Sequence, residues 1–267
     1  MEGNPEGPMS FAVDSQGRML VLDQVNRRMV RYGADGKPLG EVPLELRSPQ
    51  DVASGEDGST AVMDRLVNKS VAIYDAEGSL KGEIPLEGEG VPKGGLLSGV
   101  FVDGNDVYVE REHGSLVRIG DTQGRPAQDR AELPGRPSRD GLYFLRAGIS
   151  GAEEGRVYVT SFERATKAHR FTRELHLNMP ARTILLLDTD RQGTIYLATV
   201  VEPAPNKELL LLSCLEPEKG VPIGKAELPV NNMPEETFRT LVVLADGGVL
   251  FALMTSAGVT YQRYDCT

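Results

Sequence analysis

Short apolar runs alternate with polar turn residues along most of the chain. In residues 8–44 these runs are SFAV, MLVLD, MVRY and a last one ending in VPL, and the turn sequences SQGR and ADGK lie among them. Short runs rich in apolar and β-branched residues, bounded by Gly and Asp, are typical of antiparallel strands. The pattern therefore predicts four short strands joined by tight turns.

Residues 49–86 repeat this pattern turn for turn. Asp23 corresponds to Asp64, and GEVPL corresponds to GEIPL, at a period of 41 or 42 residues. A repeat of about 40–45 residues with four strands is typical of a β-propeller blade. Helical repeats of this length would need two amphipathic helices each, which the sequence does not show. A β-sandwich would not explain matching copies.

Further copies follow along the chain, so that six blades are expected. Their approximate bounds are residues 8–44, 49–86, 97–133, 141–178, 181–228 and 237–267. The fourth copy is the least regular, because residues 162–177 would have to hold two strands and a link. The sequence predicts an all-β protein, a six-bladed β-propeller of four-stranded antiparallel blades around a central channel, in a single domain of residues 1–267. The last copy stops after its third strand, so the last blade should be three-stranded.

Only MEGNPEGP precedes the first predicted strand, and its Pro and Gly residues make a poor strand. We therefore expect the outer edge of the last blade to be open, and the native gene to encode a longer N-terminus that supplies the missing strand. If that segment carries a secretion signal, the protein is periplasmic or secreted. Otherwise it is cytoplasmic, because the N-terminus printed here has no signal-peptide pattern.

The stretch VDSQGRMLVLDQVNRRMVRYGADGKPLGEV resembles an NHL repeat, and it is also similar to the wider superfamily of the SMP-30/gluconolactonase enzymes. The resemblance is close over residues 8–86 and fair over residues 97–133. It implies a six-bladed β-propeller. It indicates little about activity, because propellers carry many unrelated functions.

Charge and composition exclude some partners. The chain has 29 Lys and Arg against 39 Asp and Glu, a formal net charge of -10. This disfavours nucleic acid, including RNA as in some NHL proteins, because phosphate binding needs a basic surface. It equally disfavours an anionic membrane surface, and no apolar run is long enough to span a bilayer. We expect a monomer. Two cysteines, Cys214 and Cys266, are too few for a disulfide scaffold, and the sequence leaves their pairing open.

The predicted topology separates two ends of each blade. The first-to-second and third-to-fourth turns lie at one end. The second-to-third links and the links between blades lie at the other, here called the top face. Long loops on a rigid scaffold are where binding residues usually lie. The basic and histidine side chains expected there are Arg27, Arg28, Arg65, Lys69, Arg111, His113, Arg136, Arg139, Lys167 and Arg170. We therefore favour a non-catalytic module, without a cofactor, that binds a protein or another ligand through this face.

A zinc enzyme is one alternative. Three histidines, His113, His169 and His176, would suffice for a zinc site of the kind found in NHL-like amidating lyases. No motif of that family surrounds them, so the sequence predicts no zinc.

A metal-dependent lactonase-like hydrolase is the second alternative. PEGPMSFAVD looks like the opening of SMP-30-type lactonases, which implies that Glu6 would bind a divalent cation such as Ca²⁺. Further ligands would have to come from inner-strand ends, where Asn105, Asp106, Asp188 and Asp190 lie outside any recognisable motif. An oxygen-ligand site needs about six ligands, and the sequence assigns one.

Overall fold

The computed structural model describes residues 7–92, 97–111, 114–231 and 237–267. Contacts divide the chain into two compact units. Unit 1 comprises residues 1–133 and 234–240, and unit 2 comprises residues 134–233 and 241–267. Each unit holds three antiparallel sheets, and the described residues form no helix. The six sheets confirm the predicted six-bladed β-propeller.

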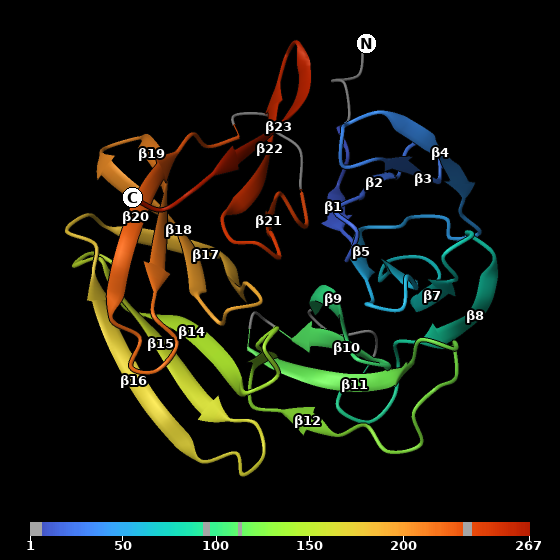
Figure 1. The fold of residues 1–267 in the computed structure, drawn as a ribbon, viewed down its shortest axis with the longest axis horizontal. Helices are drawn as coiled ribbons and strands as arrows, with labels where there is room; N and C mark the ends of the chain where they lie inside the picture. The colour runs from blue at the N-terminus through green and yellow to red at the C-terminus, as the bar shows by residue number, and fades with distance from the viewer. Residues whose placement is uncertain (1–6, 93–96, 112–113, 232–236) are drawn as a thin grey trace. The chain divides into compact units, whose positions relative to one another are not determined.

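The first two blades of unit 1 have the strands that the repeat predicts (Figure 1). They are β1 (Ser10–Val13), β2 (Met19–Asp23), β3 (Arg28–Tyr32) and β4 (Pro38–Pro43), then β5 (Asp51–Ser54), β6 (Thr60–Asp64), β7 (Ser70–Tyr74) and β8 (Leu80–Pro85). Strands pair in chain order within each sheet. Matching registers, such as Asp23 opposite Arg28 and Asp64 opposite Ser70, show that the two blades are built alike.

The third blade completes unit 1. It contains β9 (Leu97–Asp103), β10 (Asp106–Arg111), β11 (Ser115–Asp121) and the short β12 (Glu132–Leu133). The β11–β12 connection leaves the sheet after a tight turn, in which the Gly124 N–H donates to the Asp121 carbonyl.

The fourth blade, which opens unit 2, differs from the sequence prediction. Its strands are β13 (Arg136–Pro137), β14 (Tyr143–Gly151), β15 (Arg156–Glu163) and β16 (His169–His176). Residues 162–177 hold the end of β15 and one further strand, not two strands. The first strand of this blade is β13. It lies before the predicted start of the blade at residue 141, and its two residues give no hydrophobic pattern to detect.

The last two blades agree with the prediction. The fifth contains β17 (Ala181–Thr189), β18 (Ile195–Ala204), β19 (Lys207–Leu215) and β20 (Pro222–Leu228). The sixth is a sheet of three strands, β21 (Leu241–Val243), β22 (Val249–Thr255) and β23 (Gly258–Tyr264). The expectation that residues 1–8 do not supply its fourth strand cannot be followed, because residues 1–6 lie outside the described part of the chain.

The chain end is fastened to the fifth blade. Cys214 on β19 and Cys266 form a disulfide with their Cα atoms 6.3 Å apart, which answers the question the sequence left open. Beside it, the backbone N–H groups of Lys225 and Thr267 each donate to the other's carbonyl at 3.3 Å. The last residues thus extend the edge of the sheet at β20.

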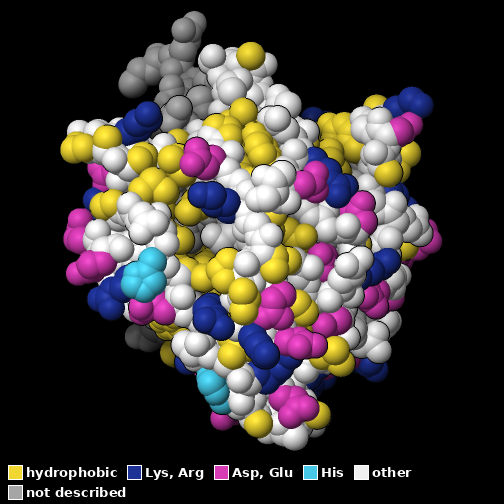
Figure 2. All heavy atoms as spheres, turned by 60° about the vertical axis from the view of Figure 1, so that its left-hand side comes forward, with side chains coloured by type: hydrophobic (Ala, Val, Ile, Leu, Met, Phe, Trp, Pro, Cys, Tyr) yellow, Lys and Arg dark blue, Asp and Glu magenta, His cyan; other side chains and the backbone are white. Residues whose placement is uncertain are grey.

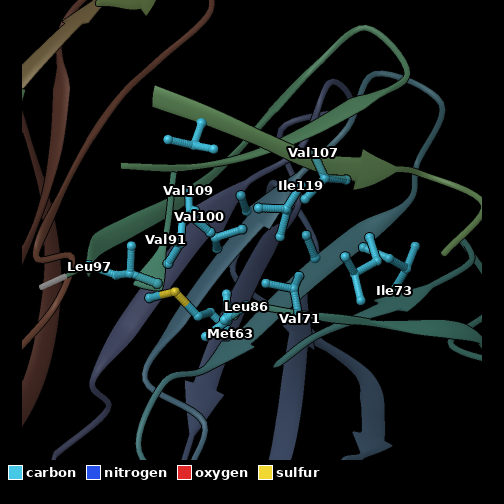
Figure 3. Close-up of a cluster of buried hydrophobic side chains, with 14 residues drawn as sticks. Met63, Val71, Ile73, Leu86, Val91, Leu97, Val100, Val107, Val109 and Ile119 are labelled. Carbon is cyan, nitrogen blue, oxygen red and sulfur yellow. The ribbon is translucent and has the colours of Figure 1, made fainter. Parts of the chain in front are cut away.

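The hydrophobic core lies between neighbouring sheets. Figure 3 shows one such layer in unit 1, where Met63 and Val71 of the second blade and Val100 and Val109 of the third lie in one buried cluster. Burying one such side chain contributes about 1.5–3 kcal/mol. Middle strands such as β6 are buried along their whole length, because both faces of the sheet are covered. This explains their continuous apolar runs.

Candidate functional site

The β2–β3 and β6–β7 links of unit 1 are shaped by an aspartate at the end of the preceding strand. The carboxylate of Asp64 accepts hydrogen bonds from the backbone N–H groups of Leu66 at 3.1 Å and Val67 at 2.8 Å. Asp23 accepts one from the Asn26 N–H at 3.3 Å. Short side chains that bind nearby N–H groups fix tight loops. The correspondence between Asp23 and Asp64 in the repeat thus has a structural cause.

Both links place a basic residue in the left-handed region. The φ angle is 49° at Arg27 and 53° at Lys69, a conformation uncommon for residues other than glycine. Each of these residues accepts a backbone hydrogen bond from the residue after the outer strand, Leu44 N–H to Arg27 at 2.8 Å and Leu86 N–H to Lys69 at 2.9 Å. The two loops therefore end in the same conformation, although the second loop is one residue longer.

The same links expose large hydrophobic side chains. Val25 is 56% exposed, Leu66 60% and Val67 51%, next to the left-handed basic residues. We call Val25, Arg27, Leu66, Val67 and Lys69 the unit 1 link surface. Exposed apolar side chains beside flexible cations are the kind of surface that contacts proteins.

Most of the basic residues predicted for the top face of unit 1 are engaged in contacts within the protein. Arg28 is paired with Asp23 at 2.8 Å and with Glu41 at 2.6 Å. Burial works to raise the pKa of Asp23, but hydrogen bonds from Asn26 and Arg28 outweigh it and lower the pKa below its usual value.

The other basic residues that were predicted for the top face of unit 1 differ in their contacts. Lys69 is paired with Glu87 at 3.0 Å, and Arg111 with Glu132 at 2.6 Å. Arg65 donates to the Leu97 carbonyl at 3.0 Å, and its guanidinium lies 4.6 Å from the centre of the Phe238 ring. The Arg27 side chain is exposed and makes no hydrogen bond or ion pair with another described residue.

In unit 2, the predicted placement of Arg139 is wrong. The Gly141 N–H donates to the Ser138 carbonyl, just as the Gly17 N–H donates to that of Asp14, so residues 138–141 are the first-to-second turn of the fourth blade. Arg139 lies in that turn, paired with Asp188 at 2.9 Å. Arg136 lies on β13 itself and donates to the Leu187 carbonyl at 2.6 Å.

Lys167 and Arg170 also lie at the opposite end of the fourth blade from the one predicted, because the sequence analysis missed β13. They lie in or beside the β15–β16 connection. Because β13 is the first strand, this connection is the third-to-fourth turn, at the end of the blade opposite to the second-to-third link. The sequence assigned residues 163–170 to the top face because it began the blade one strand too late. In the fourth blade, Arg139, Lys167 and Arg170 therefore lie at the end opposite to the one that the sequence predicted.

The residues of the two enzyme alternatives are scattered or outside the described residues. Glu6 and His113 are outside them. His169 Nε2 lies 2.9 Å from the Thr172 hydroxyl, and His176 Nε2 lies 3.2 Å from Glu174. In residues 7–92, 97–111, 114–231 and 237–267, no three His, Cys, Asp or Glu side chains are grouped so that they could hold a metal ion.

The carboxylates considered as cation ligands have partners of their own. Asp106 is paired with Arg118 at 2.7 Å, and Asp188 with Arg139. Asp190 accepts hydrogen bonds from the N–H groups of its own turn, at Gln192 and Thr194. Asn105 donates no side-chain hydrogen bond to these carboxylates, and its carbonyl accepts the Thr122 N–H at 2.9 Å. The calcium alternative stays a prediction, because Glu6, its one assigned ligand, lies outside the described residues.

Sequence reasoning missed a buried polar cluster at the inner strands of unit 1. Asp51, 1% exposed, accepts hydrogen bonds from the Ser10 hydroxyl at 2.6 Å and the Val100 N–H at 2.8 Å. The guanidinium of Arg239 donates to Asp51 at 2.8 Å and to the Val100 carbonyl at 2.7 Å, and it lies over the Phe101 ring. Ser10 and Asp51 occupy equivalent positions in the first two repeats. This correspondence does not indicate that their side chains are hydrogen-bonded to each other.

Comparison with known proteins supports the fold. No protein-family model matches the chain, and no curated protein matches its sequence. Hydrazine synthase of Kuenenia stuttgartiensis is similar in structure, with a TM-score of 0.60 and 15% identity over 95% of this chain and 77% of that one. A catalytically inactive virginiamycin B lyase from Staphylococcus aureus with quinupristin gives 0.52 and 12%, over 99% and 86%.

The dihydro-heme d1 dehydrogenase NirN, in complex with DHE, is also similar, with a TM-score of 0.51 and 14% identity over 96% of this chain and 63% of that one. Identities this low show a common fold only. The resemblance to NHL repeats and to SMP-30 enzymes is thus not confirmed by sequence comparison. No helix in the described part of the chain is long and apolar enough to cross a membrane.

Proposed function

We propose that this protein is a non-catalytic binding module that holds a protein partner on the unit 1 link surface. The observation that carries the proposal is the repetition of one display, an exposed apolar side chain followed by a left-handed basic residue, in two neighbouring blades. A left-handed residue other than glycine is unfavourable by roughly 1 kcal/mol. The fold accepts this cost at Arg27 and Lys69, where the side chain contributes nothing to the core, as it also does at Lys167, Asn178 and Asn206.

The chemistry of the surface favours a protein over a small molecule. Val25, Leu66 and Val67 offer apolar contact area, whereas Arg27 offers a charge that no described residue neutralises. Interfaces between proteins combine an apolar centre with a polar rim, and arginine is enriched in them. The side chains stand on short loops that are fixed by Asp23 and Asp64, so little conformational entropy is lost on binding.

The test uses a variant that removes the apolar side chains and keeps the loop backbone. Val25→Ser, Leu66→Ser and Val67→Ser are combined, and proteins retained by the immobilised variant are quantified against those retained by the wild type. The matched control is Leu39→Ser with Leu80→Ser, which removes leucines that are 54% and 45% exposed on the outer strands of the same two blades.

We expect the wild type and the control to retain the same partner and the link variant to lose it. Equal retention by the link variant, or equal loss by the control, would contradict the proposal. So would a wild-type protein that retains nothing beyond the bare support. Thermal unfolding of all three proteins shows whether a loss of binding reflects a loss of fold.

A further inference from the structure

The most basic stretch of this acidic chain forms one hairpin tip in unit 2. Residues 164–173 read RATKAHRFTR, with four basic residues and no acidic one, in a chain of formal net charge -10. They make up the β15–β16 turn and the first part of β16. The turn is closed by hydrogen bonds from the Glu163 N–H to the Ala168 carbonyl and from the Lys167 N–H to the Glu163 carbonyl, both 2.8 Å.

Two arginines of this tip are held in place by neutral groups. Arg170 lies with its guanidinium 4.6 Å from the centre of the Tyr143 ring and donates to the Ser161 hydroxyl at 3.2 Å. Arg173 donates to the Lys219 carbonyl at 3.3 Å. A ring, a hydroxyl and a carbonyl orient a guanidinium without cancelling its charge. By contrast, Arg28, Arg182 and Arg263 are each paired with two carboxylates.

The β19–β20 turn of the fifth blade adds a further cation. Its Gly220 is packed so closely that an added Cβ would lie 2.5 Å from the Phe171 ring and 3.2 Å from the Cβ of Arg173. Lys219 is exposed beside it. Burial works to raise the pKa of Glu216 in this turn, but hydrogen bonds from the N–H groups of Val221, Glu218 and Lys219 outweigh it and lower the pKa. This carboxylate is therefore used to build the turn.

We propose that Lys167, Arg170, Arg173 and Lys219 form a second binding site, separate from the unit 1 link surface, for an acidic and partly apolar segment of a partner protein. The apolar part of the ligand follows from Val221 and Ile223, which lie two and four residues after Lys219 and are 42% and 59% exposed. Figure 2 shows hydrophobic side chains exposed between charged ones on the face that it presents. These exposed apolar side chains favour a protein segment over nucleic acid, whose backbone presents phosphate and sugar.

The probe is a fluorescently labelled synthetic peptide of alternating Glu and Leu, and its affinity for the full chain is measured by anisotropy. A Gln and Leu peptide of equal length reports the apolar contribution alone. The site variant combines Lys167→Gln, Arg173→Gln and Lys219→Gln, and it leaves Arg170 on Tyr143 so that the packing is kept. The control combines Lys37→Gln, Arg47→Gln and Lys81→Gln, exposed residues of unit 1 that change the net charge equally.

We expect the wild type and the control to bind the Glu and Leu peptide, and the site variant to bind it about tenfold less tightly, because three ion pairs are lost. Raising the salt to about 0.5 M should weaken wild-type binding by screening. If the control variant bound the peptide as weakly as the site variant, net charge alone would explain the effect. That result would overturn the proposal. So would a wild-type protein that binds heparin or a single-stranded oligonucleotide but not the peptide, or that binds neither.

Discussion

The carboxylate of Asp51 accepts a hydrogen bond from the guanidinium of Arg239 at 2.8 Å, although the two residues are 188 positions apart in the chain. Arg239 follows the fifth blade in the sequence, yet residues 234–240 belong to unit 1. Alongside, the Phe238 N–H donates to the Met9 carbonyl at 2.8 Å, and Ser10 and Arg239 form a parallel bridge. This ion pair and these backbone contacts together hold Phe238 and Arg239 against the inner strands β1, β5 and β9.

The first prediction concerns this pair. Asp51→Asn should lower the free energy of unfolding by about 3 kcal/mol, because it leaves the mostly buried Arg239 guanidinium without its counter-ion. Urea denaturation measures the loss, and Asp35→Asn, at a solvent-exposed ion pair with Lys37, is the control with little effect. The double variant Asp51→Asn with Arg239→Met should cost less than the sum of the two single changes. Strict additivity would show that the two side chains do not act as a pair.

The second prediction concerns the disulfide. The bond closes a loop with a sequence separation of 52 residues, and a loop of that length is stabilised by about 4 kcal/mol in the chain-entropy account. Cys266→Ala should therefore lower the unfolding free energy by about that amount, and a reductant should destabilise the wild type but not the variant. Disulfides persist in oxidising compartments, so protein made in the periplasm should show no free thiol when denatured. Two free thiols in that protein would refute the pairing.

The third prediction distinguishes Arg27 from Arg65, which the sequence analysis assigned to the same top face. Arg27→Glu should leave the melting temperature unchanged, because its side chain is exposed and makes no hydrogen bond or ion pair with a described residue. Arg65→Glu should lower the unfolding free energy by about 2 kcal/mol, because it removes the contacts to the Leu97 carbonyl and the Phe238 ring. Differential scanning calorimetry of the two variants decides the matter, and an equal shift in both would contradict the assignment.

The fourth prediction concerns acid. Because the pKa of Asp23 is lowered in the folded state, the unfolded chain binds this proton more readily. The stabilisation is fully present above the unfolded pKa of about 3.9 and is lost as the pH falls through the lower folded value. Urea midpoints between neutral pH and about pH 2 should therefore decline less steeply for Asp23→Asn than for the wild type. Asp129→Asn, at an exposed position, should follow the wild type. A variant at Asp23 with an unchanged slope would exclude this cause.

The sequence by itself determined the six blades and most of their strands. Turn residues act locally: Gly17 and Gly58, with φ of +76° and +82°, occupy positions where other residues are strained. Each turn also holds an aspartate that accepts hydrogen bonds from N–H groups of the turn, Asp14 from Gln16 and Arg18, and Asp57 from Ser59. Alternating runs and turns of this kind repeat at one period, so the first two blades could be read in detail. The three-stranded last blade followed from simple counting of such runs.

Local patterns failed where a strand was too short to have one. The two residues of β13 include Pro137, and no alternation can be seen in two positions. Only pairing with Phe144 and Leu145 makes them a strand. Because β13 was missed, the prediction assigned Arg139, Lys167 and Arg170 to the wrong end of the fourth blade. The direction of every later strand in a blade depends on which strand is first.

Only the tertiary structure decided what each charged side chain does. Arg27 and Arg28 are neighbours in the sequence, yet Arg28 is neutralised by Asp23 and Glu41 while Arg27 is left at the surface. The partner of Arg239 is fixed by which inner strands lie beneath it, and Cys214 meets Cys266 because the chain end lies against β20. An electrostatic or covalent contact depends on distances of a few ångströms. Packing between elements far apart in the chain sets those distances, whereas a repeat period fixes only the elements themselves.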